Sequence, residues 1–391
     1  MAIFCLSLSS SVSYQYFSLM RNYPTQKQET DFTGTAVRTT KTTYAGYMKP
    51  TSINVYAGAG TGAPISSTLY SYDEYSANYC KNGIPGLTGV TGATGHDDNY
   101  GIAFTARGNA TTIQHLISGT TYATTHICYD TLGNVTQTVD GNGNPTTYDY
   151  SENWADTNCI PAGTLTHAFP TTVTDALAHR TKKSYFTCTS LIQSTKDEND
   201  IQAGRNGTTY TYNEFNRPIT INYPDGGQTT YCYSHDSNLP CYTTTLPPFT
   251  TESRLISGTM TLNTKTLLDS YGRVSETQLT SDPDCASGDR TDTTYDGLGR
   301  VRTVSNPYCA ASDSTYGVTT YSYDALGRTT QVTHPDGSSI LTSYTGRATQ
   351  VQDEGNGIQS VTRISQTDAL GRLSSLCEVA PGPFVGAGAS S

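Results

Sequence analysis

The chain has 391 residues, a net charge of −10 and 14% charged residues, well below the roughly 25% usual in soluble proteins. Few charges and 10% aromatic residues exclude a disordered tail, and the acidic balance argues against a nucleic-acid partner, which needs a basic face. No run of 18 apolar residues occurs, so no membrane span is predicted. The 29 Tyr and 36 Gly residues instead indicate strands and turns.

The amino-terminal residues 1–43 are expected to form an irregular segment. The chain begins MAIFCLSLSS, where no Lys or Arg precedes the short apolar run, whereas a secretory signal has a charged start. A truncated start, or a few residues before the repeats, therefore explains this stretch better than a signal peptide. The repeat region is expected to cover residues 44–379.

A repeated motif, Tyr-Asp-x-Leu-Gly-Arg, organises this region. It is clearest in TTYDGLGRVRTVSNP, which begins at Thr293, and in YSYDALGRTTQVTHPDG, which begins at Tyr321. The predicted turn residues, in chain order, are Asp130, Gly133, Asn213, Asn216, Arg217, Asp269, Gly272, Arg273, Asp296, Gly299, Arg300, Asp324, Gly327, Arg328, Asp368, Gly371 and Arg372.

The residue types of the motif suit tight turns. An Asp at the first place accepts hydrogen bonds from the following backbone N–H groups, and a Gly three residues later takes a positive φ without a Cβ clash. Asn216 stands in one Gly position, and Asn is the next best residue for that conformation. Between turns, residues of high strand propensity alternate, as in PITINY. The pattern predicts an all-β fold, a long antiparallel meander of hairpins.

The stretch after Tyr321 also offers Asp324, Arg328, His334 and Asp336, a set that an acid/base enzyme could use. Asp324, however, has five counterparts in the other copies, and one of them, Asn213, lacks the charge that a general acid needs. A catalytic pair is not normally copied along one chain. The positions are therefore interpreted as turn residues, and no catalytic or cofactor-binding residue is assigned.

This pattern resembles the Rhs/YD-repeat family, which includes carriers of bacterial polymorphic toxins, Tc-toxin C components and animal teneurins. The resemblance covers roughly Ser71 to Val379. It implies that the hairpins wind into a β-shell, here partial and open, whose partners are the remaining shell segments and the C-terminal effector of a longer parent. The family's Asp-Pro-x-Gly-Leu element is missing, with SDPDCASG at Ser281 the nearest match, so neither a protease nor a toxin is carried over.

The residues after 379 are rich in Gly, Ala, Ser and Pro, and residues 380–391 are expected to be a flexible tail. Without the segments that close such a shell, the chain is expected to be a fragment. Its strand edges and its Tyr-rich face would then be exposed, which favours self-association of the isolated chain.

Ten cysteines without a CxxC pair exclude zinc-ribbon and redox motifs. Their spacings suit local disulfides in an oxidising compartment, although a set of unpaired thiols is the alternative. The short loop YSHDSNLP separates Cys232 from Cys241, so these two are the expected pair. The sequence does not fix the other connections.

Two loops resemble the start of a calcium site. Asp140, Asn142 and Asn144 present oxygen side chains at alternate positions, but Pro145 stands where the EF-hand Gly would. The stretch DPDCASGD from Asp282 is similarly incomplete. Structural calcium is therefore the alternative to a tight hairpin at these places, and no other cofactor is expected.

The sequence predicts a non-catalytic structural protein, secreted or at the cell surface, that forms part of a shell enclosing or presenting a toxin or effector. Its Tyr rings are expected to stack across strands, at about 0.2–1 kcal/mol per pair. The alternative is a carbohydrate- or partner-binding surface module, because Tyr faces among hydroxyls and amides could hold glycans. An enzyme would need a non-repeated polar cluster near Gly83–Gly101 or Ser151–Pro170.

Overall fold

The computed structural model describes residues 11–18, 21–31, 33–46, 49–77, 79–161, 163–355, 360–368 and 371–379. The chain divides into two compact units, unit 1 with residues 1–210 and unit 2 with residues 211–391. Almost all regular elements are strands. The described part also contains a six-residue α-helix, α1 (Glu198–Ala203), and a 3-10 helix, η2 (Asp98–Tyr100). The all-β class is thereby confirmed.

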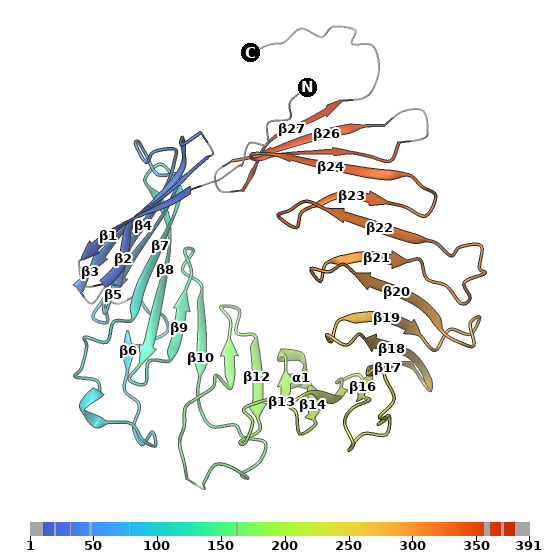
Figure 1. The fold of residues 1–391 in the computed structure, drawn as a ribbon. Helices are drawn as coiled ribbons and strands as arrows, with labels where there is room; N and C mark the ends of the chain where they lie inside the picture. The colour runs from blue at the N-terminus through green and yellow to red at the C-terminus, as the bar shows by residue number, and fades with distance from the viewer. Residues whose placement is uncertain are drawn as a thin grey trace. The chain divides into compact units, whose positions relative to one another are not determined.

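Unit 1 is an antiparallel meander in which nearly every strand pairs with its neighbours in the chain (Figure 1). Its strands are β1 (Ser11–Ser18), β2 (Arg21–Thr30), β3 (Ala36–Ala45), β4 (Lys49–Ala57), β5 (Ser66–Tyr72), β6 (Leu87–Thr88), β7 (Ala110–Ser118), β8 (Thr121–Asp130), β9 (Val135–Val139), β10 (Pro145–Asp149), β11 (Thr172–Thr174), β12 (Arg180–Tyr185) and β13 (Ile192–Lys196). The boundary between the units falls within β14 (Thr208–Tyr212). The short β6 is the exception, because it pairs parallel with the end of β8 while β5 pairs with β7.

Unit 2 continues the same pattern. Its strands follow one another as successive rungs in Figure 1, each antiparallel to the next. They are β15 (Pro218–Asn222), β16 (Gln228–Tyr233), β17 (Phe249–Ser257), β18 (Met260–Leu268), β19 (Val274–Leu279), β20 (Asp289–Tyr295), β21 (Val301–Ser305), β22 (Val318–Tyr323), β23 (Thr329–Thr333), β24 (Ser339–Thr345), β25 (Ala348–Gln352), β26 (Thr362–Thr367) and β27 (Leu373–Val379). The predicted meander is confirmed in both units.

The described part of the amino-terminal segment differs from the irregular stretch expected over residues 1–43. Strands β1, β2 and β3 pair there, with Ser11 opposite Thr30 and Gln26 opposite Lys41. These strands form although residues 11–30 lack the Tyr-Asp motif, because backbone pairing with a neighbour needs no particular side chain. Residues 1–10 and the tail at 380–391 lie outside the described residues.

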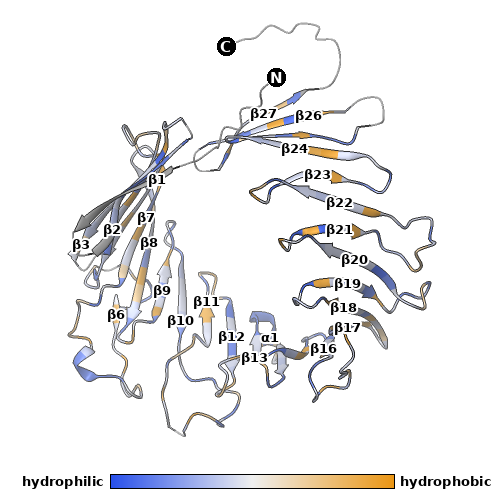
Figure 2. Ribbon diagram, viewed as in Figure 1, coloured by the Kyte–Doolittle hydropathy of each residue, from blue (hydrophilic) through white to orange (hydrophobic). Residues whose placement is uncertain are grey.

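The sheet has little conventional hydrophobic core. In the described part, the buried apolar side chains are those of Leu87, Cys128, Val139, Tyr185 and Cys285. Apolar residues are scattered along the strands in Figure 2 and do not gather in one layer. Many buried side chains are polar Thr, Ser and Gln residues. Hydrogen bonds, turns and cross-links therefore carry a large share of the stability of this sheet.

Four disulfides fix irregular segments, two by a bond to a strand residue (Cys128 of β8 and Cys232 of β16) and two by a bond between loops. They join Cys80 to Cys128, Cys159 to Cys188, Cys232 to Cys241 and Cys285 to Cys309. The structure thus contains the link between Cys232 and Cys241 that the short loop suggested. Cys377 is a free, exposed thiol, and Cys5 lies outside the described residues.

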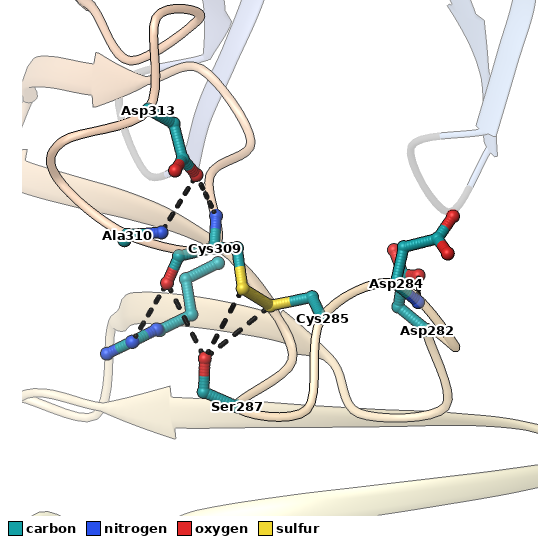
Figure 3. Close-up of a disulfide and its surroundings, with 8 residues drawn as sticks. Asp282, Asp284, Cys285, Ser287, Cys309, Ala310 and Asp313 are labelled. Atoms are coloured by element: carbon teal, nitrogen blue, oxygen red, sulfur yellow. Dashed lines mark hydrogen bonds between the residues drawn. A yellow bond between two sulfur atoms is a disulfide. The ribbon is translucent and has the colours of Figure 1, made fainter.

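The disulfide between Cys285 and Cys309 shows how such a cross-link is supported (Figure 3). The Asp313 carboxylate accepts hydrogen bonds from the backbone N–H groups of Cys309 and Ala310, both at 2.8 Å. The loop between β21 and β22 is therefore held by a covalent bond and by two charge-assisted hydrogen bonds.

Candidate functional site

The repeat turns are the most regular feature of the molecule, and the turn at Asp324 is representative. Its Oδ1 accepts hydrogen bonds from the backbone N–H groups of Leu326 and Arg328, both at 2.9 Å. The Gly327 N–H donates to the Asp324 carbonyl, and the Asp324 N–H donates to the Arg328 carbonyl. Gly327 has φ +79°. This is a three-residue hairpin loop, a type I turn closed by a left-handed Gly.

The same backbone contacts recur at every predicted turn. Those at Asp130, Asn213, Asp269, Asp296 and Asp368 all have the first residue's N–H bonded to the carbonyl four residues later. Turns with the same backbone contacts also begin at Asp31 and Asp175, which the motif did not predict, and at Asp140, where a tight hairpin was one of the two expectations.

The turn at Asp140 bears on the calcium alternative. Its Oδ1 accepts the N–H groups of Asn142 and Asn144 at 2.9 and 2.8 Å, and its Oδ2 accepts the Asn144 side-chain amide at 3.0 Å. Both oxygens are thus used within the hairpin. In the described part of the chain, no group of three His, Cys, Asp or Glu side chains could hold a metal ion, at Asp282 or elsewhere.

In most of these turns, the second carboxylate oxygen of the Asp binds the side chain four residues on. In four repeats this partner is an Arg, whose Nε lies 2.7–2.8 Å from Oδ2, as for Arg300 on Asp296 and Arg328 on Asp324. Hydrogen bonds from the Arg300 backbone N–H and side chain lower the pKa of Asp296. The motif therefore couples an Asp and an Arg through turn geometry, which is why both recur at a fixed spacing.

The turn at Asn213 shows what replaces the carboxylate. Asn213 Oδ1 keeps both backbone hydrogen bonds, to Phe215 and Arg217 at 3.1 and 2.9 Å. Its amide nitrogen donates to Asp236 Oδ2 at 2.7 Å, and Arg217 lies 3.5 Å from the same oxygen. In this repeat, the negative charge near the Arg is therefore carried by the buried Asp236 and not by the first residue of the turn.

The Arg that ends a turn also lies over a Tyr ring of a following strand. The guanidinium carbon is 4.0–4.5 Å from the ring centroid for the pairs Arg217 with Tyr233, Arg273 with Tyr295, Arg300 with Tyr323, and Arg328 with Tyr344. The hydroxyl of the same Tyr donates to the carbonyl of the residue after the Arg, at 2.7–3.0 Å. We call this pair of contacts the Arg–Tyr clasp.

A β-bulge lies next to two of the four clasp tyrosines. The strand register shifts just before Tyr295 and just before Tyr323, the residues that precede Asp296 and Asp324. Bulges re-aim the side chains that follow them. The clasp differs from the cross-strand Tyr stacking expected from the sequence. Ring pairs such as Tyr308 with Tyr316 do occur, at 5.0 Å, but in these repeats the Tyr face meets an Arg.

The irregular stretch Ser151–Pro170 contains a polar cluster around Glu152. Its Oε1 accepts the backbone N–H groups of Thr166 and His167, at 2.5 and 2.8 Å. Its Oε2 accepts the indole N–H of Trp154 and the hydroxyl of Thr166. The carboxylate is therefore engaged in holding the loop, and this geometry offers no free acid or base.

In the stretch Gly83–Gly101, a carboxylate likewise holds the backbone. The Asp97 carboxylate accepts the Asn99 N–H at 3.0 Å and caps η2. Arg107 binds the carbonyls of Gly101 and Thr131, both at 2.7 Å, and so ties this stretch to the turn at Asp130. The longest helix in the described residues, α1, is too short to cross a membrane.

Comparison with known proteins identifies one repeat directly. Residues 312–339, which contain the turn at Asp324, match the family model described as RHS Repeat. This match supports the resemblance seen in the sequence at this repeat. No curated protein matches the chain.

Among solved structures, the chain is similar to the TcdB2–TccC3 complex, with 13% identity, a TM-score of 0.39, and coverage of 95% of this chain and 23% of that chain. For the same complex without its hypervariable C-terminal region, the identity is 12% and the TM-score 0.43, and the match covers 95% of this chain and 21% of that chain. For a Photorhabdus luminescens Tc holotoxin pore, the identity is 12% and the TM-score 0.30, and the match covers 95% of this chain and 20% of that chain. The chain spans about a fifth of the length of these proteins.

Proposed function

We propose that this Rhs/YD-repeat chain is a non-catalytic wall segment of a secreted shell that encloses or presents the effector of a longer parent assembly. The observation that carries the proposal is the Arg–Tyr clasp, which links the turns at Asn213, Asp269, Asp296 and Asp324 to later strands of unit 2. The repeated residues hold successive hairpins of one sheet together. They do not converge on a reacting centre, as catalytic groups must.

The clasps form a connected series. Asp296 binds Arg300, Arg300 lies over Tyr323, and Tyr323 directly precedes the next turn residue, Asp324. Arg300 Nη1 also donates to the Asp324 carbonyl at 3.2 Å. Because each contact spans only neighbouring hairpins, strands can be added without a closed core, as in other repeat proteins. A wall with few buried apolar residues can be built in this way.

The four disulfides support the secreted location. Disulfides persist in oxidising compartments and are rare where thiols are kept reduced. In this chain they fix loops that carry few apolar contacts of their own, such as the one between Cys232 and Cys241. A protein of this construction would lose its loop order in the cytosol.

The alternative of sugar binding on repeat Tyr faces finds no support at the clasps. There the Arg guanidinium covers one face of the ring, as at Tyr295 and Tyr344. A saccharide would have to displace that cation and the hydrogen bond of the Tyr hydroxyl. We therefore do not propose the repeats themselves as a glycan surface.

Limited proteolysis tests the wall function on the protein isolated together with the polypeptides that accompany it in its natural source. If the chain walls off an effector, mass spectrometry should find effector peptides that survive protease in the intact assembly. The same peptides should be digested once the assembly is reduced and unfolded. Equal digestion of the effector in the intact and the unfolded sample would contradict an enclosing function.

A further inference from the structure

Turn geometry accounts for the Asp, the Gly and the Arg of the repeat turns, but not for the apolar residue at the third place. In the turns that join β18 to β19, β20 to β21 and β22 to β23, this residue is Tyr271, Leu298 and Leu326. Their exposed fractions are 83%, 79% and 78%. Apolar side chains stabilise a fold when they are buried, so these three contribute little to their own chain.

The three side chains form a row along one edge of unit 2. Alternate connections of an antiparallel meander lie on the same edge of the sheet. In Figure 1 these turns follow one another along one edge, whereas the long loops of residues 280–288 and 306–317 lie on the other. Neighbouring strands are about 4.8 Å apart, so an apolar residue recurs about every 9.6 Å. We call Tyr271, Leu298 and Leu326 the turn row.

The turn row is electrically balanced, although the whole chain carries a net charge of −10. Each of its turns contains an ion pair between the Asp and the Arg, with N–O distances of 2.6–2.7 Å. The residues between the Asp and the apolar side chain are small and uncharged, namely Ser270, Gly297 and Ala325. Two copies of the chain can therefore approach each other through this edge without strong like-charge repulsion.

Unit 1 shows what covers a turn of this kind within the same chain. The loop that carries β6 lies against the turn at Asp130, where the Val90 N–H donates to Thr131 Oγ1 at 3.0 Å. Arg107 donates to the Thr131 carbonyl at 2.7 Å. Leu132, at the third place of this turn, is half-buried. Polypeptide thus packs on such a turn, and the turn row offers three of them side by side.

The period of the turn row selects its partner. Close packing lets a side chain enter the space between two others only where the facing surface has the same spacing. A spacing of two strands belongs to another row of repeat turns and not to an irregular protein surface. A two-fold axis would set two such rows antiparallel, with each Leu298 beside the Leu298 of the other copy.

We propose that the turn row is a contact surface between two copies of this chain, in which the apolar side chains of the two rows interdigitate. Three side chains per copy cover much less than the roughly 800 Å² per partner of a stable interface, so the contact is weak and reversible. It goes beyond the wall function, which concerns hairpins of one chain. It also differs from pairing through free strand edges, because side chains of turns make it.

Sedimentation velocity with the full, disulfide-bonded chain tests the proposal. The sedimentation coefficient should rise over a roughly hundredfold range of concentration and fit a monomer–dimer equilibrium. The double variant Leu298→Ser, Leu326→Ser should weaken the association by about tenfold or more, because it removes two of the three apolar contacts. Its urea midpoint should stay unchanged, since both side chains are exposed.

Leu177→Ser is the matched control. Leu177 has the third place in the turn at Asp175 and is 77% exposed. It belongs to no apolar row, because the preceding turn on that edge has Asn142 at this place. The variant should therefore associate as the parent chain does.

Cysteine cross-linking locates the contact. The background Cys5→Ser, Cys377→Ser removes the two cysteines outside the four disulfides. In it, Leu298→Cys should form an intermolecular disulfide under mild oxidation, and Leu177→Cys should form far less.

Three results would overturn the proposal. One is a monomer at every concentration. Another is association that the double serine variant leaves unchanged, which would assign it to the strand edges. The third is flotation of a monomeric chain with phosphatidylcholine vesicles that the double variant loses, which would assign the turn row to a lipid surface.

Discussion

Arg300 lies over the ring of Tyr323, with the guanidinium carbon 4.5 Å from the ring centroid, and the Tyr323 hydroxyl donates to the carbonyl of the residue that follows Arg300, at 2.7 Å. One Tyr side chain thus contacts both the side chain and the backbone of the preceding repeat. This relationship explains why the chain uses Tyr where Phe would bury similar area, because only Tyr offers a ring face and a hydroxyl donor together.

The Arg–Tyr clasp predicts that removing the hydroxyl oxygen of Tyr323 lowers the free energy of unfolding. Tyr323→Phe keeps the ring over Arg300 and loses the hydrogen bond to the Val301 carbonyl. We expect a loss of about 0.5–1.5 kcal/mol in the free energy of unfolding, measured by urea denaturation. Tyr321→Phe on the same strand is the control, because the Tyr321 hydroxyl has no partner among the described residues. Equal effects of the two variants would show that the hydroxyl contact does not stabilise the repeat.

The turn residue Asp324 makes separable contacts through its two oxygens. Asp324→Asn keeps an oxygen for the N–H groups of Leu326 and Arg328, as Asn213 does in its own turn. Asp324→Ala removes the acceptor altogether. We therefore expect Ala to lower the urea midpoint clearly and Asn to lower it less, because an exposed ion pair contributes little. If Asp324→Asn lowers the urea midpoint as much as Asp324→Ala does, our interpretation of the turn is wrong.

The turn glycine is required for its backbone conformation. A Cβ on Gly327 would meet nothing closer than the Arg300 side chain at 4.0 Å, yet its φ is +79°. Gly327→Ala should cost about 1 kcal/mol and Gly327→Val more, whereas Gly327→Asn should be the mildest change. Asn216 already occupies the equivalent place at φ +60°.

The control for these glycine variants is Gly297→Ala in the preceding turn. Gly297 has no positive φ and open space at its Cβ position, so the variant should be neutral or slightly stabilising in the same urea titration. A loss equal to that of Gly327→Ala would mean that side-chain bulk, and not φ, limits these turns.

The sequence predicted the turns because their chemistry is local. Asp296, Gly299 and Arg300 act within five residues, so their spacing is visible without a structure. The turns at Asp31 and Asp175 were missed because they lack Leu-Gly-Arg. Their signal was a hydrogen-bonding residue four places after the Asp, Thr35 and His179, together with a residue that adopts positive φ between them.

The clasps could not be predicted in this way. A Tyr hydroxyl reaches a carbonyl 15 to 22 residues earlier, a distance set by hairpin lengths and bulges. The sequence pointed to the stretch Ser151–Pro170 as a possible site, but it gave no indication that Glu152 would be used to position His167.

The turn carboxylates predict a dependence of stability on pH. Hydrogen bonds from the Arg328 backbone and side chain lower the pKa of Asp324 below its ordinary value of 3.8, and Asp296 is affected likewise by Arg300. A lowered pKa in the folded state stabilises the fold above the unfolded pKa, and this contribution is lost as pH falls through the folded pKa. Urea midpoints should therefore drop below about pH 4. The double variant Asp296→Asn, Asp324→Asn should show a shallower drop, and parallel curves would count against this origin.

The disulfide between Cys232 and Cys241 offers a test in which a covalent contribution can be measured alone. It closes a short loop, with a sequence separation of 9, and in the chain-entropy model such a loop contributes about 2.6 kcal/mol. The double variant Cys232→Ser, Cys241→Ser should lose roughly this amount or somewhat less, because the loop between them keeps hydrogen bonds of its own, such as Asn213 with Asp236. Cys377→Ser is the matched control, since Cys377 is exposed and free, and it should leave the urea midpoint unchanged. Alkylation of the oxidised, native protein followed by peptide mapping checks the premise. Cys377 should be labelled, whereas labelling of Cys232 or Cys241 before reduction would show that the cross-link, and with it the oxidising location, is wrongly assigned.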